Sequence, residues 1–339
     1  MPLTPMPFRR PVTRRLALHA AAATASALAL PNAGAQSPTF PVAGKAVRVV
    51  IGFPPGVGVD AQARAVTPKL SELLGVPVVI DNKPGAGTLI SAQEVIKSAP
   101  DGHTIFYSAS STMAQIPHTL SAATFDPMKE FTPISLGARG PLALVVNNAL
   151  GVRDVKELIA YGKANPGKLS FGSFGIGTSA HIFGDVFAKN TGLDLTHVPY
   201  RGSSDLSADL QENRIQMAFD AAPSAINNAR SGKVKLFAVA APTRWVFLPD
   251  VPTFKEQGVA DIDIVSFLGW YGPAGMHPDV VRKLHAALVA SIGQQSVKDN
   301  YALGAYTAES SSPQELAANT KQAFEAWGAL VKRAGIAKQ

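Results

Sequence analysis

Two glycine-rich segments of the chain could hold an anion without a charged side chain. The first spans residues 53–60, after a run of β-branched residues and before a helical pattern. It contains no Lys or Arg, but backbone N–H groups at a helix N-terminus attract carboxylate or phosphate. We therefore expect main-chain amides to bind the anion here. The candidate binding residues are Phe53, Pro54, Gly56, Val57, Gly58 and Asp60.

The first segment is open to two other interpretations. Gly56, Gly58 and Ala61 fit the spacing of a dinucleotide-binding fingerprint, and Asp81 follows the next predicted strand. Two prolines directly before the glycines weigh against a nucleotide site. The segment could also be an ordinary turn in which Asp60 caps the following helix.

The second glycine-rich segment, residues 170–181, also lies between a predicted strand and a predicted helix. Its three glycines let the backbone approach a ligand closely. The candidate binding residues are Ser173, Gly175, Gly177, Thr178 and Ser179. We expect this segment and the first to lie on opposite sides of one cleft and to face each other.

Further candidates follow other predicted strands, where α/β proteins place their sites. Ala109 and Ser110 come after the strand predicted at 104–107, and Asp220 comes after the strand predicted at 215–219. We expect Asp220 to contact the end of the ligand away from the bound carboxylate. The alternative is that Asp220 only forms a turn.

An exported hydrolase that uses His181, Ser173 and Asp220 is the alternative function. Ser173 does not fit the nucleophile-elbow motif, because Phe171 stands where that motif needs glycine. The seven histidines show no metal-binding spacing, and the chain has no cysteine, so we expect no catalytic residues, no metal and no cofactor.

The 339 residues alternate β-rich runs with helical patterns, which is typical of α/β units. The pattern restarts once, so we predict two lobes, each a mostly parallel sheet flanked by helices. Residues 36–141 and 270–339 form the first lobe and 142–269 the second. The chain crosses between lobes near 142–146 and 265–271, and the C-terminal helix is free to pack on the second lobe.

Residues 1–35 are typical of a signal peptide. Four arginines precede a short apolar stretch, and small residues offer cleavage near Ala35. The leader fits the Sec route, and its paired arginines also fit the twin-arginine route. The leader's arginines account for much of the formal net charge of +7, and only 16% of all residues are charged, so we expect no nucleic-acid partner.

The order of several motifs resembles the substrate-binding proteins of tripartite tricarboxylate transporters, the TctC or Bug family. These motifs are Phe53-Pro54-Pro55-Gly56 with Asp60, Asn82-Lys83-Pro84-Gly85-Ala86-Gly87, Pro100-Asp101-Gly102, Ala164-Asn165-Pro166-Gly167-Lys168, His197-Val198-Pro199-Tyr200-Arg201-Gly202 and Leu248-Pro249-Asp250-Val251-Pro252-Thr253. Val57, Pro68, Thr88, Ser91 and His103 depart from the usual pattern.

The resemblance implies a type II periplasmic-binding-protein-like fold whose lobes close on a small organic acid. It implies that segments 53–60 and 173–179 hold a carboxylate, that Tyr200 belongs to the site, and that Asp220 helps set ligand preference. It further implies a monomeric periplasmic receptor for uptake or sensing, with membrane subunits of a tripartite transporter as possible partners. The ligand would be a di- or tricarboxylate, an amino acid or an aromatic carboxylate.

Overall fold

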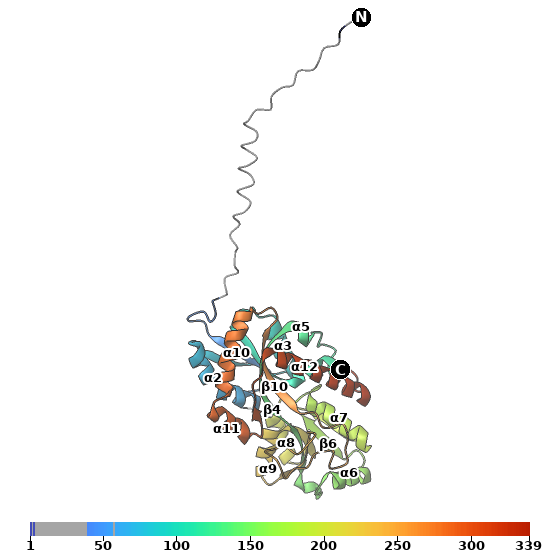
Figure 1. Ribbon diagram of the computed structural model, residues 1–339. Coiled ribbons are helices and arrows are strands. Elements are labelled where there is room, and N and C mark those ends of the chain that lie inside the picture. Colours follow the sequence, from blue (N-terminus) through green and yellow to red (C-terminus); the bar gives the residue numbers. More distant parts are fainter. Residues whose placement is uncertain (2, 4–38, 57) are drawn as a thin grey trace. The chain divides into compact units, whose positions relative to one another are not determined.

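Two β-sheets organise the part of the chain that the structure describes. This computed structural model describes residues 1, 3, 39–56 and 58–339, and the region from residue 39 onward belongs to one structural unit (Figure 1). The predicted leader and its cleavage point near Ala35 lie outside the described residues, apart from Met1 and Leu3. No helix among the described residues is long and apolar enough to cross a membrane.

The first sheet has the strand order β11-β4-β10-β3-β1-β2. Strand β1 is parallel to β2 and β3, whereas β10 is antiparallel to β3 and β4, and β11 is antiparallel to β4. The bounds are β1 Val47–Ile51, β2 Val78–Asn82, β3 Thr104–Ala109, β4 Phe131–Gly140, β10 Ser266–Pro273 and β11 Thr307–Ala308.

The second sheet has the order β7-β6-β8-β5-β9. Strand β6 is parallel to β7 and β8, and β5 is antiparallel to β8 and β9. The bounds are β5 Leu142–Asn147, β6 Leu169–Ser173, β7 Leu195–Pro199, β8 Met217–Ala221 and β9 Val234–Val239. Sheet membership thus changes between β4 and β5 and changes back between β9 and β10.

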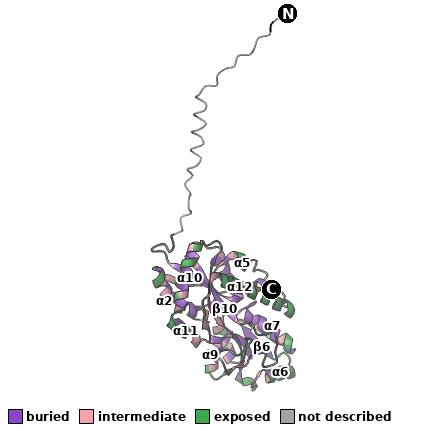
Figure 2. Ribbon diagram, viewed as in Figure 1, coloured by how far each residue is buried: buried purple, intermediate pink, exposed green. Residues whose placement is uncertain are grey.

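The expectation of mostly parallel sheets is wrong, because both sheets are mixed. The antiparallel pairs come from β4, β5, β10 and the short β11. Strand β5 is the first strand after the chain enters the second sheet, and β10 is the first after it returns to the first sheet. Both are buried along their whole length, as Figure 2 shows for β10. A strand buried on both faces reads as a continuous apolar run, and such a run does not reveal its direction.

Helices cover both sheets. They are α2 Gly58–Leu74, α3 Leu89–Ile96, α4 Ile116–Thr119, α5 Pro127–Glu130, α6 Val155–Ala164, α7 Ser179–Thr191, α8 Ser203–Gln211, α9 Ala222–Arg230, α10 Pro278–Ile292, α11 Gln295–Leu303 and α12 Pro313–Ala334, with short helical turns η1 Ala86–Thr88, η2 Ser111–Gln115 and η3 Asn148–Leu150. Helix α2 continues through Pro68, so this proline does not end it.

Helix α12 packs against both sheets' cores. The predicted capping box is present: Glu315 N–H donates to Ser312 Oγ, and Ser312 N–H donates to the Glu315 carboxylate. Near its start, Leu316 lies in the apolar cluster of the first sheet, whereas the Trp327 ring lies 5.0 Å from the Phe183 ring of α7. One helix therefore ties the two halves of the described fold together.

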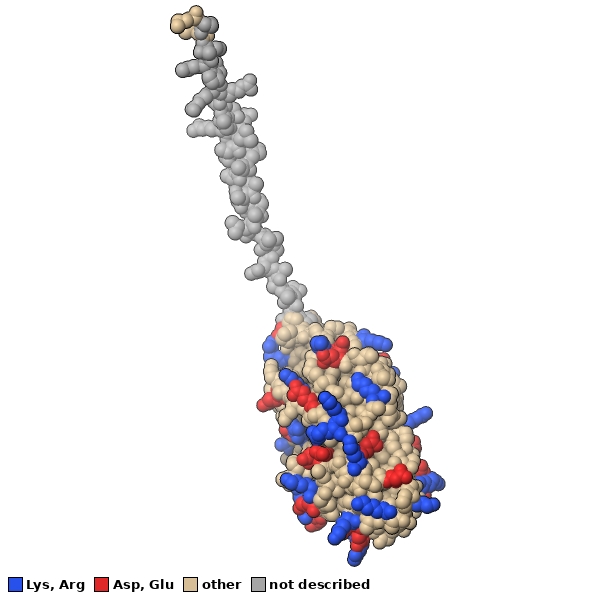
Figure 3. All heavy atoms as spheres, turned by 90° about the vertical axis from the view of Figure 1, so that its right-hand side faces the viewer, with Lys and Arg blue, Asp and Glu red and all other residues tan. Residues whose placement is uncertain are grey.

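The outer surface carries mixed charge. Figure 3 shows Lys and Arg interspersed with Asp and Glu on one face of the molecule. Ion pairs between neighbouring side chains on the surface include Arg153 with Glu157 and Lys69 with Glu72. Exposed pairs of this kind contribute little to stability.

Close packing of α7 on β6 gives the first prediction. A Cβ at Gly184 would overlap the Phe171 ring, so Gly184→Ala should lower the free energy of unfolding by ~1–3 kcal/mol. Denaturant unfolding of the variant measures the loss. Phe171→Leu in the Gly184→Ala background should recover part of it, because it removes the ring. Wild-type stability of Gly184→Ala would contradict the packing described here.

Candidate functional site

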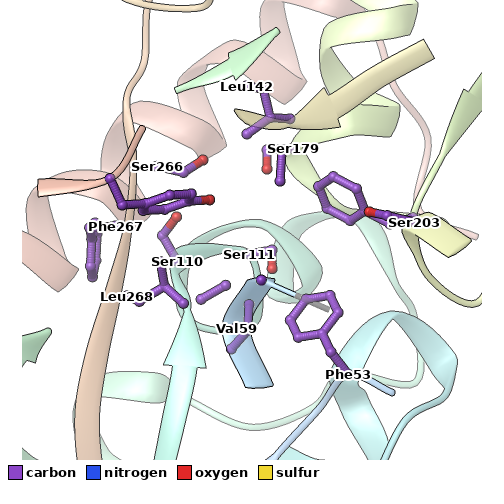
Figure 4. Close-up of a pocket in the computed structure, with 15 residues that line it drawn as sticks. Phe53, Val59, Ser110, Ser111, Leu142, Ser179, Ser203, Ser266, Phe267 and Leu268 are labelled. Atoms are coloured by element: carbon purple, nitrogen blue, oxygen red, sulfur yellow. The ribbon is translucent and has the colours of Figure 1, made fainter. Parts of the chain in front are cut away.

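Several helices begin at the wall of one cavity, which we call the inner cavity (Figure 4). Its volume is about 60 Å³. Gly58, Ser111, Ser179 and Ser203 line it, and these are the first residues of α2, η2, α7 and α8; Ala221, which directly precedes α9, lines it too. The first N–H groups of a helix lack partners within the helix, so these elements surround the cavity with partial positive charge.

Serine hydroxyls add hydrogen-bonding capacity to this wall. Figure 4 shows Ser110, Ser111, Ser179 and Ser266 around the cavity. The hydroxyl oxygens of Ser110, Ser111 and Ser266 are buried and have no hydrogen-bond partner among the described residues. Leaving a buried polar group unpaired costs ~1–3 kcal/mol, so a polar ligand that pairs these groups would be stabilised here.

Asp220 lies behind this wall, at the end of β8. Its Oδ1 accepts hydrogen bonds from Ser203 Oγ and from the N–H of Ala221, both at 2.8 Å. Its Oδ2 is buried without a partner among the described residues. Burial raises the pKa of Asp220 to about 6, against the opposing effect of the hydrogen bonds. Burial, with the charge of Asp220 as a second cause, raises the pKa of Tyr306, which also lines the cavity.

Two phenylalanines bring the glycine-rich segments together, as predicted. Phe53 follows β1 and Phe174 follows β6, and their ring centroids lie 6.3 Å apart in an edge-to-face arrangement. Both rings line the inner cavity. The two segments therefore meet at one edge of the cavity, each extending from a different sheet.

The polar groups of segment 53–60 are used to hold the segment itself. Asp60 is buried and accepts hydrogen bonds from Gly56 N–H, Arg64 and Asn82. Burial opposes the charge of Asp60, but these hydrogen bonds outweigh it and lower the pKa of the carboxyl. Phe53 and Gly58 line the cavity, whereas Pro54, Gly56 and Asp60 do not, and Val57 lies outside the described residues.

Segment 173–179 is likewise held by internal bonds. The hydroxyl of Thr178 donates to the carbonyl of Gly175, and Gly177 N–H donates to His181 Nδ1. Ser173 Oγ lies 2.8 Å from His197 Nε2. Of the five predicted residues here, only Ser179 lines the inner cavity. The others shape the segment that carries Ser179 and Phe174.

Two stacked imidazoles support segment 173–179 from behind. The rings of His181 and His197 lie 4.1 Å apart, and His181 Nε2 lies 3.4 Å from a carboxylate oxygen of Asp185. Burial lowers the pKa of both histidines, that of His197 to about 3, with charge repulsion from His181 as a second cause. Both rings are therefore neutral near pH 7.

The three residues of the hydrolase hypothesis are not arranged as a triad. Ser173 pairs with His197 and not with His181, and Asp220 pairs with Ser203 and Ala221. Ser173 does not line the inner cavity. Among the described residues, no group of three or more His, Asp or Glu side chains is placed to hold a metal ion.

Tyr200 lies at a second hollow, which we call the outer hollow. Its volume is about 450 Å³, and it is bounded by residues 85–89, 199–201 and Gly175, and by Phe53 and Phe174. The hydroxyl of Tyr200 donates to Asp209 at 2.8 Å. Ala109 and Ser110, in contrast, line the inner cavity, at the end of β3 and directly after it.

Sequence motifs did not indicate several cavity residues. Ser203 starts a helix, Ser266 starts the buried strand β10, and Tyr306 precedes the short strand β11. Their only sequence signal is position: Ser203 follows the turn after β7, and Ser266 lies at the predicted crossing between lobes. Phe174 lies inside a segment that was predicted, but its aromatic side chain was not singled out.

Comparison with known proteins identifies the family. The profile described as "Tripartite tricarboxylate transporter family receptor" matches residues 62–336. The chain belongs to this family. A UPF0065 protein in the tcbD-tcbE intergenic region of a Pseudomonas species is 35% identical over 83% of this chain and 84% of its own. The resemblance inferred from the motifs is confirmed.

Solved structures agree with this family and fold. A protein from R. palustris solved with adipate is 30% identical, with a TM-score of 0.84 over 89% of this chain and 100% of its own. MatC from Rhodopseudomonas palustris, solved with bound malate, is 28% identical, with a TM-score of 0.81 over 86% of this chain and 100% of its own. The two-lobed periplasmic-binding-protein fold is therefore confirmed, and family members of this kind are binding proteins.

The histidine stack predicts a pH dependence of stability. The unfolded chain binds a proton at His197 near pH 6.5, but the folded chain does so only near pH 3, so stability falls as pH drops below 6.5. In His197→Gln the melting temperature should fall less between pH 7 and pH 4.5 than in the wild type. His285→Gln, outside the stack, serves as the control. The prediction would be contradicted if the melting temperature fell equally between pH 7 and pH 4.5 in all three proteins.

Proposed function

We propose that the protein is a periplasmic receptor that binds a small organic acid reversibly in the inner cavity, for uptake or sensing. The observation that carries this proposal is the convergence of helix N-termini and unpartnered serine hydroxyls on one cavity. In this proposal the lobes comprise residues 36–141 with 270–339, and 142–269, and they close on the ligand. Export by the leader, a monomeric state and membrane subunits of a tripartite transporter as partners belong to the same proposal.

A carboxylate suits this cavity better than a cationic or neutral group. The lining contains no Lys or Arg, so the attraction must come from helix N-termini, each worth ~0.3–1 kcal/mol when exposed and up to ~2 in partly buried geometries. Hydrogen bonds to a charged group add ~1.5–3 kcal/mol each. Ser110, Ser111 and Ser266 offer hydroxyl donors that no described residue uses.

Asp220 would select the part of the ligand that lies beside Ser203. Asp220 does not itself line the inner cavity, but Ser203, which it holds, does. With a pKa of about 6, the carboxyl of Asp220 is mostly ionised at neutral pH, and its buried Oδ2 would accept a hydrogen bond from a ligand group that reaches it beside Ser203. A hydroxyl, an ammonium or a ring N–H would pair with it, and a second carboxylate would be repelled. The adipate and malate of the structural relatives make organic diacids the first ligands to test.

The carboxylate requirement can be tested by calorimetry. Adipate and malate should bind, whereas their diamides should bind at least tenfold more weakly, because the amides lack the charge that the helix termini stabilise. Ser110→Ala should weaken binding of the acids by ~1.5–3 kcal/mol, through loss of a hydrogen bond to a charged group. Ser108→Ala is the matched control, because Ser108 does not line the inner cavity. Equal binding of acid and amide would refute the proposal.

Exchanging Asp220 for asparagine keeps its size and removes its charge. Asp220→Asn should weaken the binding of acids with a hydroxyl or amino group by ~1.5–3 kcal/mol, the scale of a hydrogen bond to a charged group. It should strengthen the binding of acids with a second carboxylate. The wild-type preference should also shift toward diacids as pH falls through about 6, where Asp220 is protonated. If ligand ranking is unchanged in the variant and only stability changes, Asp220 is a turn residue outside the site.

A further inference from the structure

The inner cavity and the outer hollow are neighbours separated by the same two rings. Phe53 and Phe174 line both spaces. These are the residues through which the two glycine-rich segments meet, with centroids 6.3 Å apart. A chain of methylene groups could pass beside these two apolar rings without burying an unpaired polar group.

The inner cavity is too small for a long organic acid. A water-sized group needs roughly 10–15 Å³ of such volume, so 60 Å³ holds roughly four to six non-hydrogen atoms. A carboxylate group alone has three. Any acid with a longer carbon chain must extend out of the inner cavity, and the outer hollow, at about 450 Å³, has room for it.

Arg201 provides the charge at the outer hollow. It is exposed, it lines the hollow, and it forms no hydrogen bond or ion pair with any residue that the structure describes. It is also the one Lys or Arg among the described residues that line either space. The hollow is also lined by the polar residues Thr88, Tyr200 and Gln339, by glycines, and by apolar side chains, among them Leu120 and Ile176, which suit a carbon chain.

We propose that Arg201 forms a second anion subsite, so that the receptor binds an elongated acid with a carboxylate at each end. One carboxylate pairs with the serines of the inner cavity, the carbon chain passes Phe53 and Phe174, and the second carboxylate pairs with Arg201. This subsite rests on the proposed function.

Calorimetry with matched acids tests the subsite. Straight-chain diacids from succinate to suberate are compared with monoacids of equal carbon number, using the wild type, Arg201→Gln and Arg230→Gln. Arg230 is exposed on α9 and lines neither space, so its variant removes the same charge elsewhere. In the wild type, diacids should bind more tightly than the matched monoacids only when their carbon chain is long enough to reach Arg201. Arg201→Gln should abolish that advantage, a loss of tenfold or more, and leave short monoacids unchanged.

Each other outcome overturns the subsite. If Arg201→Gln lowers the affinity for diacids and monoacids equally, Arg201 acts only through its long-range electrostatic field. The same conclusion follows if Arg230→Gln lowers the affinity for diacids as much as Arg201→Gln does. No loss in Arg201→Gln would mean that lobe opening, and not the outer hollow, accommodates long acids. If no acid binds to the wild type, the proposed function fails together with the subsite, whereas binding of monoacids and diacids alike leaves the proposed function intact.

Discussion

Buried N–H groups at the starts of helices must find partners, and in this protein α2, α7, α8 and the turn η2 all start at one cavity. Their first residues include Gly58, Ser179 and Ser203. Helix α2 follows a strand of the first sheet, whereas α7 and α8 follow strands of the second. Such a cluster of partial positive charge is favourable only when a negative or strongly accepting group lies at its centre. The two-sheet architecture creates this cluster, because it brings strand ends and helix starts from two directions to the same point.

Internal hydrogen bonds hold the described parts of the segments that bound the cavity. Asp60 fixes the first through Gly56, Arg64 and Asn82, and the second is fixed by Thr178 and the paired histidines behind it. A binding loop that is already ordered loses less conformational entropy on binding. The polar side chains within the two glycine-rich segments therefore serve mainly to hold backbone amides and aromatic rings in place.

This division explains which parts of the site could be predicted from sequence. Spacing of glycines between a strand and a helix indicated both segments, and Phe53, Gly58 and Ser179 of these segments line the cavity. The same logic could not show that Asp60 and Thr178 hold the segments in place instead of lining the cavity. Residues of the same types serve both purposes. Ser266 and Tyr306 lie far along the chain, and only the antiparallel return of β10 and β11 to the first sheet brings them near.

In the proposed binding mode, Asp220 and Arg201 would have opposite effects on a diacid, and they act over different ranges. Asp220 is buried, so its charge acts at short range in a medium that screens it weakly, whereas Arg201 is exposed and water screens its field. Arg201 can therefore contribute to affinity only by direct pairing, while Asp220 repels an anion that merely comes close. An acid too short to reach Arg201 would meet the repulsion of Asp220 without the pairing, whereas a longer acid would gain the pairing. In the proposed subsite, discrimination by chain length would therefore follow from direct pairing with an exposed charge that only a long acid reaches.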